Sequence, residues 1–379
     1  MQTCCVYDII IIIKMCEVLG VMNNNETNLT MPERIRNIVC DAGFMEFCAR
    51  EADKNQFVKY FDTYLKLARI NTANERVNKD MFNMYLSPPQ VEAATIEFYE
   101  WLDSVCPSKP LAPQVKENMK YVTYDFNRIP DRVKGEHPRA GCGHVIENNE
   151  MVDAWIFLED KADIRDALSS THEHMHALSK HFTTGKPYKD ATMGELLTLI
   201  VDELTLCFLE QKTGNKQLAQ EIRKSHVVLQ VEKAKRSVLD CLILNVMKQN
   251  CSPQEKLQQL NALQQQYGSI ISEKDLADCV RQIENKKYEP LFEARYIFAQ
   301  LAAMQIGDRF QQIMYYKQHG TPDQVELANA EEFRIISTIK DILEKDTEIS
   351  LDQALDMLCL PPKEVLTDNY QFRLSGKGM

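Results

Sequence analysis

The segment His172-Glu173-His174-Met175-His176 has the residue types and spacing of a metal-assisted hydrolytic site. It reads HExxH, with imidazoles at residues 172 and 176. On a helix, residues four apart lie one above the other on the same face, so both rings can bind one zinc ion. A glutamate beside the first histidine can then act on the zinc-bound water. The predicted reaction class is metal-assisted hydrolysis, most often of a peptide bond.

A catalytic zinc site also needs a third protein ligand and one open position. Glu195 opens an apolar run that extends to Leu204, and we expect its carboxylate to be that ligand. The alternative for Glu195 is a carboxylate that stabilises the helix N-terminus through the dipole, with Glu203 as the third ligand. Asp202 and Glu203 lie about two turns after Glu195, where either carboxylate could orient a ligating imidazole.

The remaining polar residues of the motif take their roles from their direction on the helix. Glu173 cannot point at the metal with its neighbour, because adjacent helical residues face different ways. We therefore expect Glu173 to be the general base that takes a proton from the water and later protonates the leaving amine. His174 and His181 are expected to face solvent or to support the ligands rather than to bind the metal.

The elements that must hold these residues are a small sheet and a helix. Residues 120–126 and 153–158 and the segment His144 to Glu147 are rich in β-branched and aromatic residues, and a loop with proline and glycine is expected from Ile129 to Gly143. The predicted organisation is an N-terminal extension or linker (1–30), a helical N-terminal region (31–118) and a metallopeptidase region (119–379). The last region divides into a sheet (119–160), the HExxH helix (162–182, ended by Thr183 to Pro187) and a helical C-terminal lobe (190–379).

Four helix starts can be read from their caps. Ser87, Ser252, Thr321 and Ser350 each stand three residues before a glutamine or glutamate, and three of them precede a proline. Only 13 glycines interrupt the 379 residues. The predicted fold class is therefore mainly α (α+β), with a small sheet next to the HExxH helix.

Composition excludes several classes of function. A formal net charge of -11 without a basic stripe argues against a nucleic-acid partner. The isoleucine run from Ile9 to Ile13 is too short to span a bilayer and lacks the pattern of a signal peptide, so we expect a buried strand or short helix and no membrane partner. The 12 cysteines form no CxxC pair, which indicates reduced thiols in a reducing, cytoplasmic compartment.

With Glu195 in place, the chain resembles the gluzincins, zinc peptidases that combine HExxH with a downstream glutamate. Within this group it is similar to a short, divergent member of the family of thimet oligopeptidase and oligoendopeptidase F. The similarity covers about residues 135–330. It depends on the glycine-bearing turn Arg139 to Gly143, the strand at 153–158, the stretch His172 to Lys180, the seven-residue interval from Glu195 to Asp202, and the tyrosine-bearing helix Tyr288 to Ala303.

The resemblance implies a zincin-like helical fold, Zn²⁺ as the cofactor, and a tyrosine that hydrogen-bonds the oxyanion of the tetrahedral intermediate. Tyr296 is the first candidate and Tyr288 the second. The edge of the sheet, near His144 or 153–158, is expected to pair with the substrate backbone. Met175 departs from the family, which has glycine there, and the chain is shorter than its members, so the substrate is either a peptide or a protein.

Two other functions stay open at this point. One is a helical interaction protein or an inactive pseudopeptidase, in which HExxH binds no metal; the helical pattern of residues 205–270, rich in glutamine, suits partner binding. The other is a secreted effector-type protease that acts on a host protein after delivery into the host cell.

Overall fold

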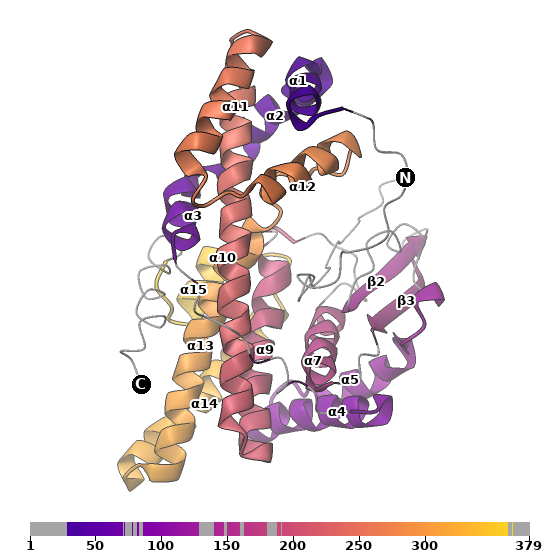
Figure 1. Cartoon of the computed structure of the whole chain (residues 1–379). Coiled ribbons are helices and arrows are strands. Elements are labelled where there is room, and N and C mark those ends of the chain that lie inside the picture. Colours follow the sequence, from indigo (N-terminus) through magenta and orange to yellow (C-terminus); the bar gives the residue numbers. More distant parts are fainter. Residues whose placement is uncertain are drawn as a thin grey trace. The chain divides into compact units, whose positions relative to one another are not determined.

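The structure is a computed structural model of the chain and describes residues 29–70, 86–128, 140–147, 150–159, 163–179, 188–190 and 192–362, with the single residues 72, 78, 82 and 366. The predictions for residues 1–28, His181 and the segment 183–187 fall outside these described residues. The prediction of a mainly helical fold with a small sheet is confirmed (Figure 1).

The chain divides into two compact units, which are described separately. Unit 1 takes its residues from Arg76–His226 and Phe298–Phe372, and unit 2 from Ile13–Glu75 and Val227–Ile297. Two long helices, α10 (Lys216–Met247) and α13 (Ala294–His319), contribute residues to both units. The predicted domain boundaries at residues 30 and 118 stay a prediction.

Unit 1 contains the three strands and most of the long helices. Its strands are β1 (Val122–Thr123), β2 (Ala140–Glu147) and β3 (Glu150–Leu158), preceded by α4 (Pro88–Val105), α5 (Ala112–Asn118) and the 3₁₀ turn Met119–Tyr121, with a second such turn at Phe126–Arg128. The later helices are α7 (Ile164–Leu178), α9 (Met193–Thr213), α14 (Pro322–Leu343) and α15 (Leu351–Met357).

The sheet has the strand order β1-β3-β2, with β1 parallel and β2 antiparallel to β3. Cys142 of β2 pairs with Ile156 of β3, and both pack against Ala177 of α7. The loop predicted for 129–143 is therefore wrong over 140–143, because these residues pair with the C-terminal half of β3. The strand predicted at 120–126 shortens to Val122–Thr123, which is all that pairs with β3.

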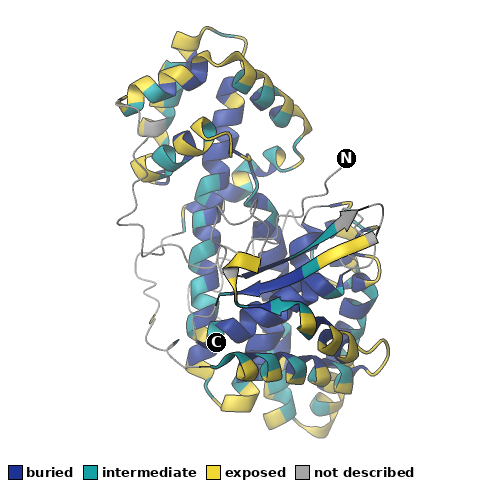
Figure 2. Cartoon of the chain, turned by 90° about the vertical axis from the view of Figure 1, so that its right-hand side faces the viewer, coloured by how far each residue is buried: buried dark blue, intermediate teal, exposed yellow. Residues whose placement is uncertain are grey.

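The core of unit 1 surrounds the helix that carries the motif. Helix α7 contacts β2 and β3 of the sheet and the helices α4, α5 and α9. Every residue from Ala167 to Ala177 is buried, and the helices behind the sheet are dark blue over most of their length in Figure 2. The motif therefore lies in a water-poor interior, where electrostatic interactions are stronger than at the surface.

All four predicted N-caps are confirmed. Helices α4, α11 (Pro253–Tyr267), α14 and α15 begin immediately after Ser87, Ser252, Thr321 and Ser350, each with the reciprocal bonds of a capping box. Helix α7 uses Asp163 in the same way, since its side chain accepts from the Arg165 backbone N–H at 2.8 Å. It ends at Leu178 with Ser179 as its C-cap, and the part of the predicted helix from 180 to 182 lies outside the described residues.

The hairpin of β2 and β3 depends on a glycine opposite a tryptophan. A Cβ atom added to Gly143 would lie 2.6 Å from Cζ2 of Trp155, closer than real Cβ contacts allow. We expect Gly143→Ala to lower the free energy of unfolding by about 1–3 kcal/mol through overpacking, measured by chemical denaturation. Gly43→Ala is the matched control, because its added Cβ would meet only Asp41 Oδ1 at 3.3 Å. Equal stabilities of the two variants would contradict this prediction.

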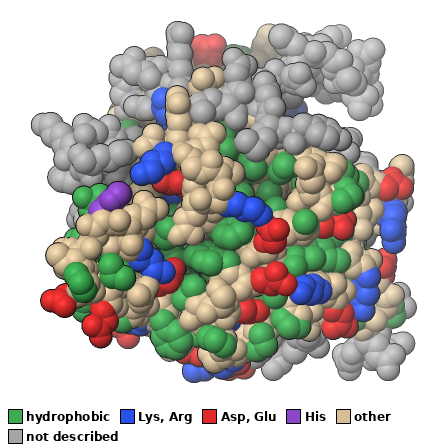
Figure 3. Space-filling view, turned by 90° about the horizontal axis from the view of Figure 1, so that it is seen from below, with side chains coloured by type: hydrophobic (Ala, Val, Ile, Leu, Met, Phe, Trp, Pro, Cys, Tyr) green, Lys and Arg blue, Asp and Glu red, His purple; other side chains and the backbone are tan. Residues whose placement is uncertain are grey.

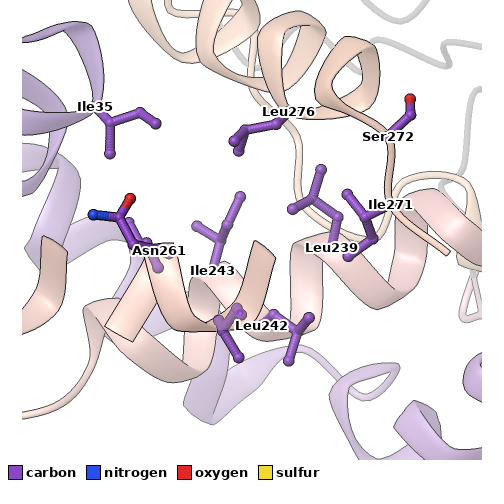
Figure 4. Close-up of a pocket in the computed structure, with 10 residues that line it drawn as sticks. Ile35, Leu239, Leu242, Ile243, Asn261, Ile271, Ser272 and Leu276 are labelled. Carbon is purple, nitrogen blue, oxygen red and sulfur yellow. The ribbon is translucent and has the colours of Figure 1, made fainter. Parts of the chain in front are cut away.

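Unit 2 is helical in its described residues. Its elements are α1 (Met31–Cys40), α2 (Ala42–Lys54), the 3₁₀ turn Val58–Tyr60, α3 (Phe61–Ala68), α11, α12 (Glu273–Glu284) and parts of α10 and α13. It contains a pocket lined by apolar side chains together with Asn261 and Ser272 (Figure 4). No histidine, cysteine or charged side chain lines this pocket, so it offers none of the groups that the predicted chemistry needs.

Among the described residues, none of the helices combines the length and the apolar composition that a membrane span requires.

Candidate metal centre

Helices α7 and α9 bring three possible metal ligands together. His172 and His176 lie one turn apart on α7, and Glu195 lies in the first turn of α9. One ligand atom from each of these residues lies within 4.8 Å of the others, and all three side chains are buried. This is the single group of this kind among the described residues. Of Glu195 and Glu203, the two acids considered as third ligand, only Glu195 belongs to this group.

The three donor atoms lie close enough together to share one metal ion. The two Nε2 atoms of His172 and His176 are 3.1 Å apart, and Oε2 of Glu195 is 3.9 Å and 4.0 Å from them. Ligand atoms about 2.0–2.1 Å from zinc at tetrahedral angles lie roughly 3.3 Å apart, so the two nitrogens have nearly this spacing and the carboxylate oxygen lies farther out. Two ring nitrogens that converge on one carboxylate oxygen in a buried site form the donor set that zinc prefers, so these residues fit the ion.

Asp202 contacts the ring nitrogen of His172 that faces away from the other ligand atoms. Its Oδ2 lies 3.1 Å from Nδ1 of His172, on the side of the ring away from His176. Because Nε2 faces the other ligand atoms, metal binding through Nε2 would require Nδ1 to carry the hydrogen and to donate a hydrogen bond to this oxygen. A carboxyl group in this position fixes the tautomer and the direction of the ring.

Burial, with Glu203 as the neighbouring acid, holds the pKa of Asp202 well above its usual range, and His226 acts in the opposite direction. An oxygen of Asp202 can accept from Nδ1 in either protonation state, so the contact does not depend on ionisation. A divalent cation at the group would favour the ionised form of this acid.

Two further residues of the motif are enclosed in the core. Glu173 is fully buried and lies outside the group of three, in line with a role other than ligand. His174 is also fully buried, so the alternative in which it faces solvent is wrong. Its Nδ1 donates to the Ser170 carbonyl at 2.8 Å, and burial lowers the pKa of His174 to about 4. The ring is therefore neutral at physiological pH.

The two candidate tyrosines belong to unit 2. The hydroxyl of Tyr288 donates to Asp240 Oδ1 at 3.1 Å, and burial raises the pKa of this phenol well above its usual value. Arg295 Nη2 donates to the Tyr296 hydroxyl at 3.2 Å, and Nζ of Lys233 lies 3.8 Å from the centre of the Tyr296 ring. A role of either tyrosine beside the metal group of unit 1 stays a prediction.

We expect Asp202→Asn to weaken zinc binding by about 10- to 100-fold, the usual effect of removing a group that orients a ligand. The amide can no longer carry the negative charge that a carboxylate offers to the His172 N–H. The dissociation constant is measured by competition with a chromophoric chelator. Asp346→Asn, at another buried acid of unit 1, is the control. An unchanged zinc affinity in Asp202→Asn would remove Asp202 from this role.

Three residues that surround Glu203 were not predictable from any motif or spacing. Arg223 and His226 of α10 and Gly307 of α13 contact the Glu203 side chain, although they are distant from it along the chain. A charged residue within a long helix is ordinarily a solvent-exposed one, so composition alone would not single out Arg223.

Comparisons with known proteins place the fold. Neither protein-family models nor curated proteins give a match. Two solved structures are similar, each with a TM-score of 0.52 and 12% sequence identity. One is described as an oligoendopeptidase F from Bacillus anthracis str. Ames, matched over 88% of this chain and 58% of that chain. The other is PZ peptidase A with an inhibitor, matched over 93% of this chain and 60% of that chain.

This chain spans about three fifths of the length of the two peptidases that it matches. At 12% identity the likeness concerns the fold, which agrees with the fold expected from the resemblance to oligopeptidases. The chain has the mainly helical fold of these peptidase structures, and in that fold it carries a buried His-His-Glu group that could hold a metal.

Proposed function

We propose that this protein is a zinc-dependent metallopeptidase that hydrolyses peptide bonds. The observation that carries the proposal is the buried group of His172, His176 and Glu195 on two adjacent helices, with Asp202 behind one imidazole. The peptidase structures that share its fold support the same reaction class.

Each residue of the group has a distinct task in this proposal. His172, His176 and Glu195 would hold the ion, and Asp202 would fix the direction of the His172 ring. When bound, zinc supplies a Lewis acid that activates water and polarises the scissile carbonyl. Glu173, a buried carboxylate, would accept the proton of the attacking water and deliver it to the leaving amine. Tyr296, or Tyr288 in its place, would donate a hydrogen bond to the oxyanion.

The substrate in this proposal is a peptide or a protein, without a nucleic-acid or membrane partner. On the face drawn in Figure 3, the basic side chains of the described residues are interspersed with acidic ones, which supports the proposal of no nucleic-acid partner. We also propose a reducing, cytoplasmic compartment, which is supported by the nine described cysteines, none of which forms a disulfide. Delivery into a host cell is a variant of the same proposal.

The test combines metal content with peptide cleavage. Zinc in the purified chain is measured by elemental analysis, and a peptide library is incubated with the metal-loaded protein and read by mass spectrometry. One zinc per chain and cleavage that a chelator abolishes would support the proposal. A folded chain that takes up no zinc would refute it and favour the helical interaction protein. Zinc binding without cleavage of any peptide or protein would favour the inactive pseudopeptidase.

A further inference from the structure

The charge pair of Glu203 and Arg223 lies next to Asp202 and has no role in the proposed chemistry. Glu203 follows Asp202 on α9 and is 1% exposed. Its Oε2 lies 3.2 Å from Nε of Arg223, and its Oε1 lies 3.7 Å from Nδ1 of His226. A carboxylate removed from water needs such partners, because burial strongly disfavours its charged form.

The backbone of α13 closes another side of this carboxylate. A Cβ atom added to Gly307 would lie 2.6 Å from Glu203 Oε2 and 3.1 Å from the Glu203 Cβ. The glycine thus lets the α13 backbone approach the Glu203 side chain directly. Glu203 is therefore held between a guanidinium and a helix backbone.

Arg223 contacts more than one turn of α9. In addition to its contact with Glu203, Arg223 places Nη2 at 3.3 Å from Sγ of Cys207 and Nη1 at 3.5 Å from Oε2 of Glu210. Residues 203, 207 and 210 share one face of the helix, as the helical period requires. The planar guanidinium is suited to such a bridge, because its donors point in fixed directions. The contacts of Arg223 with these three residues therefore favour one rotation of α9 about its own axis.

That rotation matters at the metal group. Successive residues of an α-helix are turned by about 100° relative to each other. With Glu203 fixed on one side of α9, Asp202 points to another side, where its Oδ2 meets Nδ1 of His172 at 3.1 Å. Glu195 precedes Asp202 by seven residues, two turns, and so faces the same way.

We propose that Arg223 and Glu203 are a positioning pair that sets the rotation of α9, and with it the direction of Asp202 and Glu195 toward the two histidines. The inference rests on the proposed zinc site, and it assigns no contact with substrate to either residue.

The test uses the whole chain and separates position from stability. The double variant Glu203→Leu with Arg223→Met replaces a buried charge pair with apolar side chains of similar size, a change that is often neutral for stability. The matched control is Glu332→Leu with Lys317→Met, a pair in unit 1 that joins α14 to α13 and whose Glu332 is 3% exposed. Thermal unfolding of the metal-free proteins, the zinc dissociation constant, and the visible spectrum of the cobalt-loaded proteins are measured.

We expect the Glu203–Arg223 double variant to unfold near the wild-type temperature and yet to bind zinc about 10- to 100-fold more weakly, the range for groups that orient ligands. Its cobalt spectrum should shift, because the ligand geometry changes. The control pair should leave both metal readouts unchanged. Gly307→Ala keeps every charge but pushes the Glu203 carboxylate aside, so it should also weaken zinc binding by about 10-fold.

Wild-type zinc affinity and an unchanged cobalt spectrum in Gly307→Ala and in the double variant would overturn the positioning role while leaving the proposed function in place. Gly307→Ala decides the question if the double variant does not fold. A wild-type chain that binds no zinc would overturn both the proposed function and the positioning role.

Discussion

Glu173→Gln is expected to retain zinc and to lose peptide hydrolysis by about 10²- to 10⁴-fold, the usual contribution of a general acid–base group. Glutamine has nearly the same shape as glutamate, so the packing around this fully buried side chain should persist. It cannot accept a proton from water, however, and therefore cannot pass one to the leaving amine. Because Glu173 lies outside the group of three proposed ligands, the metal content should not change.

The measurement is the rate of cleavage of one library-selected peptide, together with zinc per chain for both proteins. Glu332→Gln is the matched control, since it makes the same replacement at another buried glutamate of unit 1. We expect the control to keep both zinc and rate. A Glu173→Gln protein with wild-type kcat would remove Glu173 from its role, and one without zinc would indicate that this carboxylate helps to hold the metal.

The parts of this fold that were predictable from the sequence are those that depend on neighbouring residues. Ser252, for example, caps α11 with a proline at the next residue and a glutamate three residues on, and all the atoms of the capping box lie within four residues. The positions of His172 and His176 on one helical face follow from local geometry in the same way. Such features need no knowledge of the rest of the chain.

The parts that were not predictable depend on pairing between distant segments. Ala140 to Gly143 looked like a loop because of their small residues, but the length of β3 gives them pairing partners from Trp155 to Leu158. Residues 120–126 have strand-like composition, and only two of them find a partner. Amino-acid composition indicates a preference for the strand conformation, but a strand forms only where a neighbouring segment is available for pairing.

The same distinction applies to the candidate site. The seven-residue interval from Glu195 to Asp202 predicted that both residues belong to the candidate site. It could not decide whether Glu195 or Glu203 is the third member of the group with the histidines. That decision follows from the rotation of α9. Arg223 and Gly307, which contact the Glu203 side chain, come from helices that begin after α9 ends. No spacing within the motif reports their approach.

Removal of one histidine is expected to have the largest effect on the metal itself. In His176→Ala the group keeps only His172 and Glu195, two of the three ligands that a catalytic zinc site needs. The loss of a ligand should weaken zinc binding by more than the 10- to 100-fold expected from the loss of an orienting group. Peptide cleavage should fall with the metal content.

The readout that does not depend on activity is thermal stabilisation by zinc. A ligand at 100 times its dissociation constant stabilises the folded state by about 2.7 kcal/mol, so the wild-type protein should unfold at a higher temperature when zinc is added. His176→Ala should lose most of this shift, because it lacks one ligand. Its shift is measured against its own metal-free form, so any effect of the substitution on packing cancels. His319→Ala, at an exposed histidine of α13, should keep the full shift. If His176→Ala retained one zinc per chain and the wild-type stabilisation, His176 would not be a ligand, and the metal would have to be held by other residues.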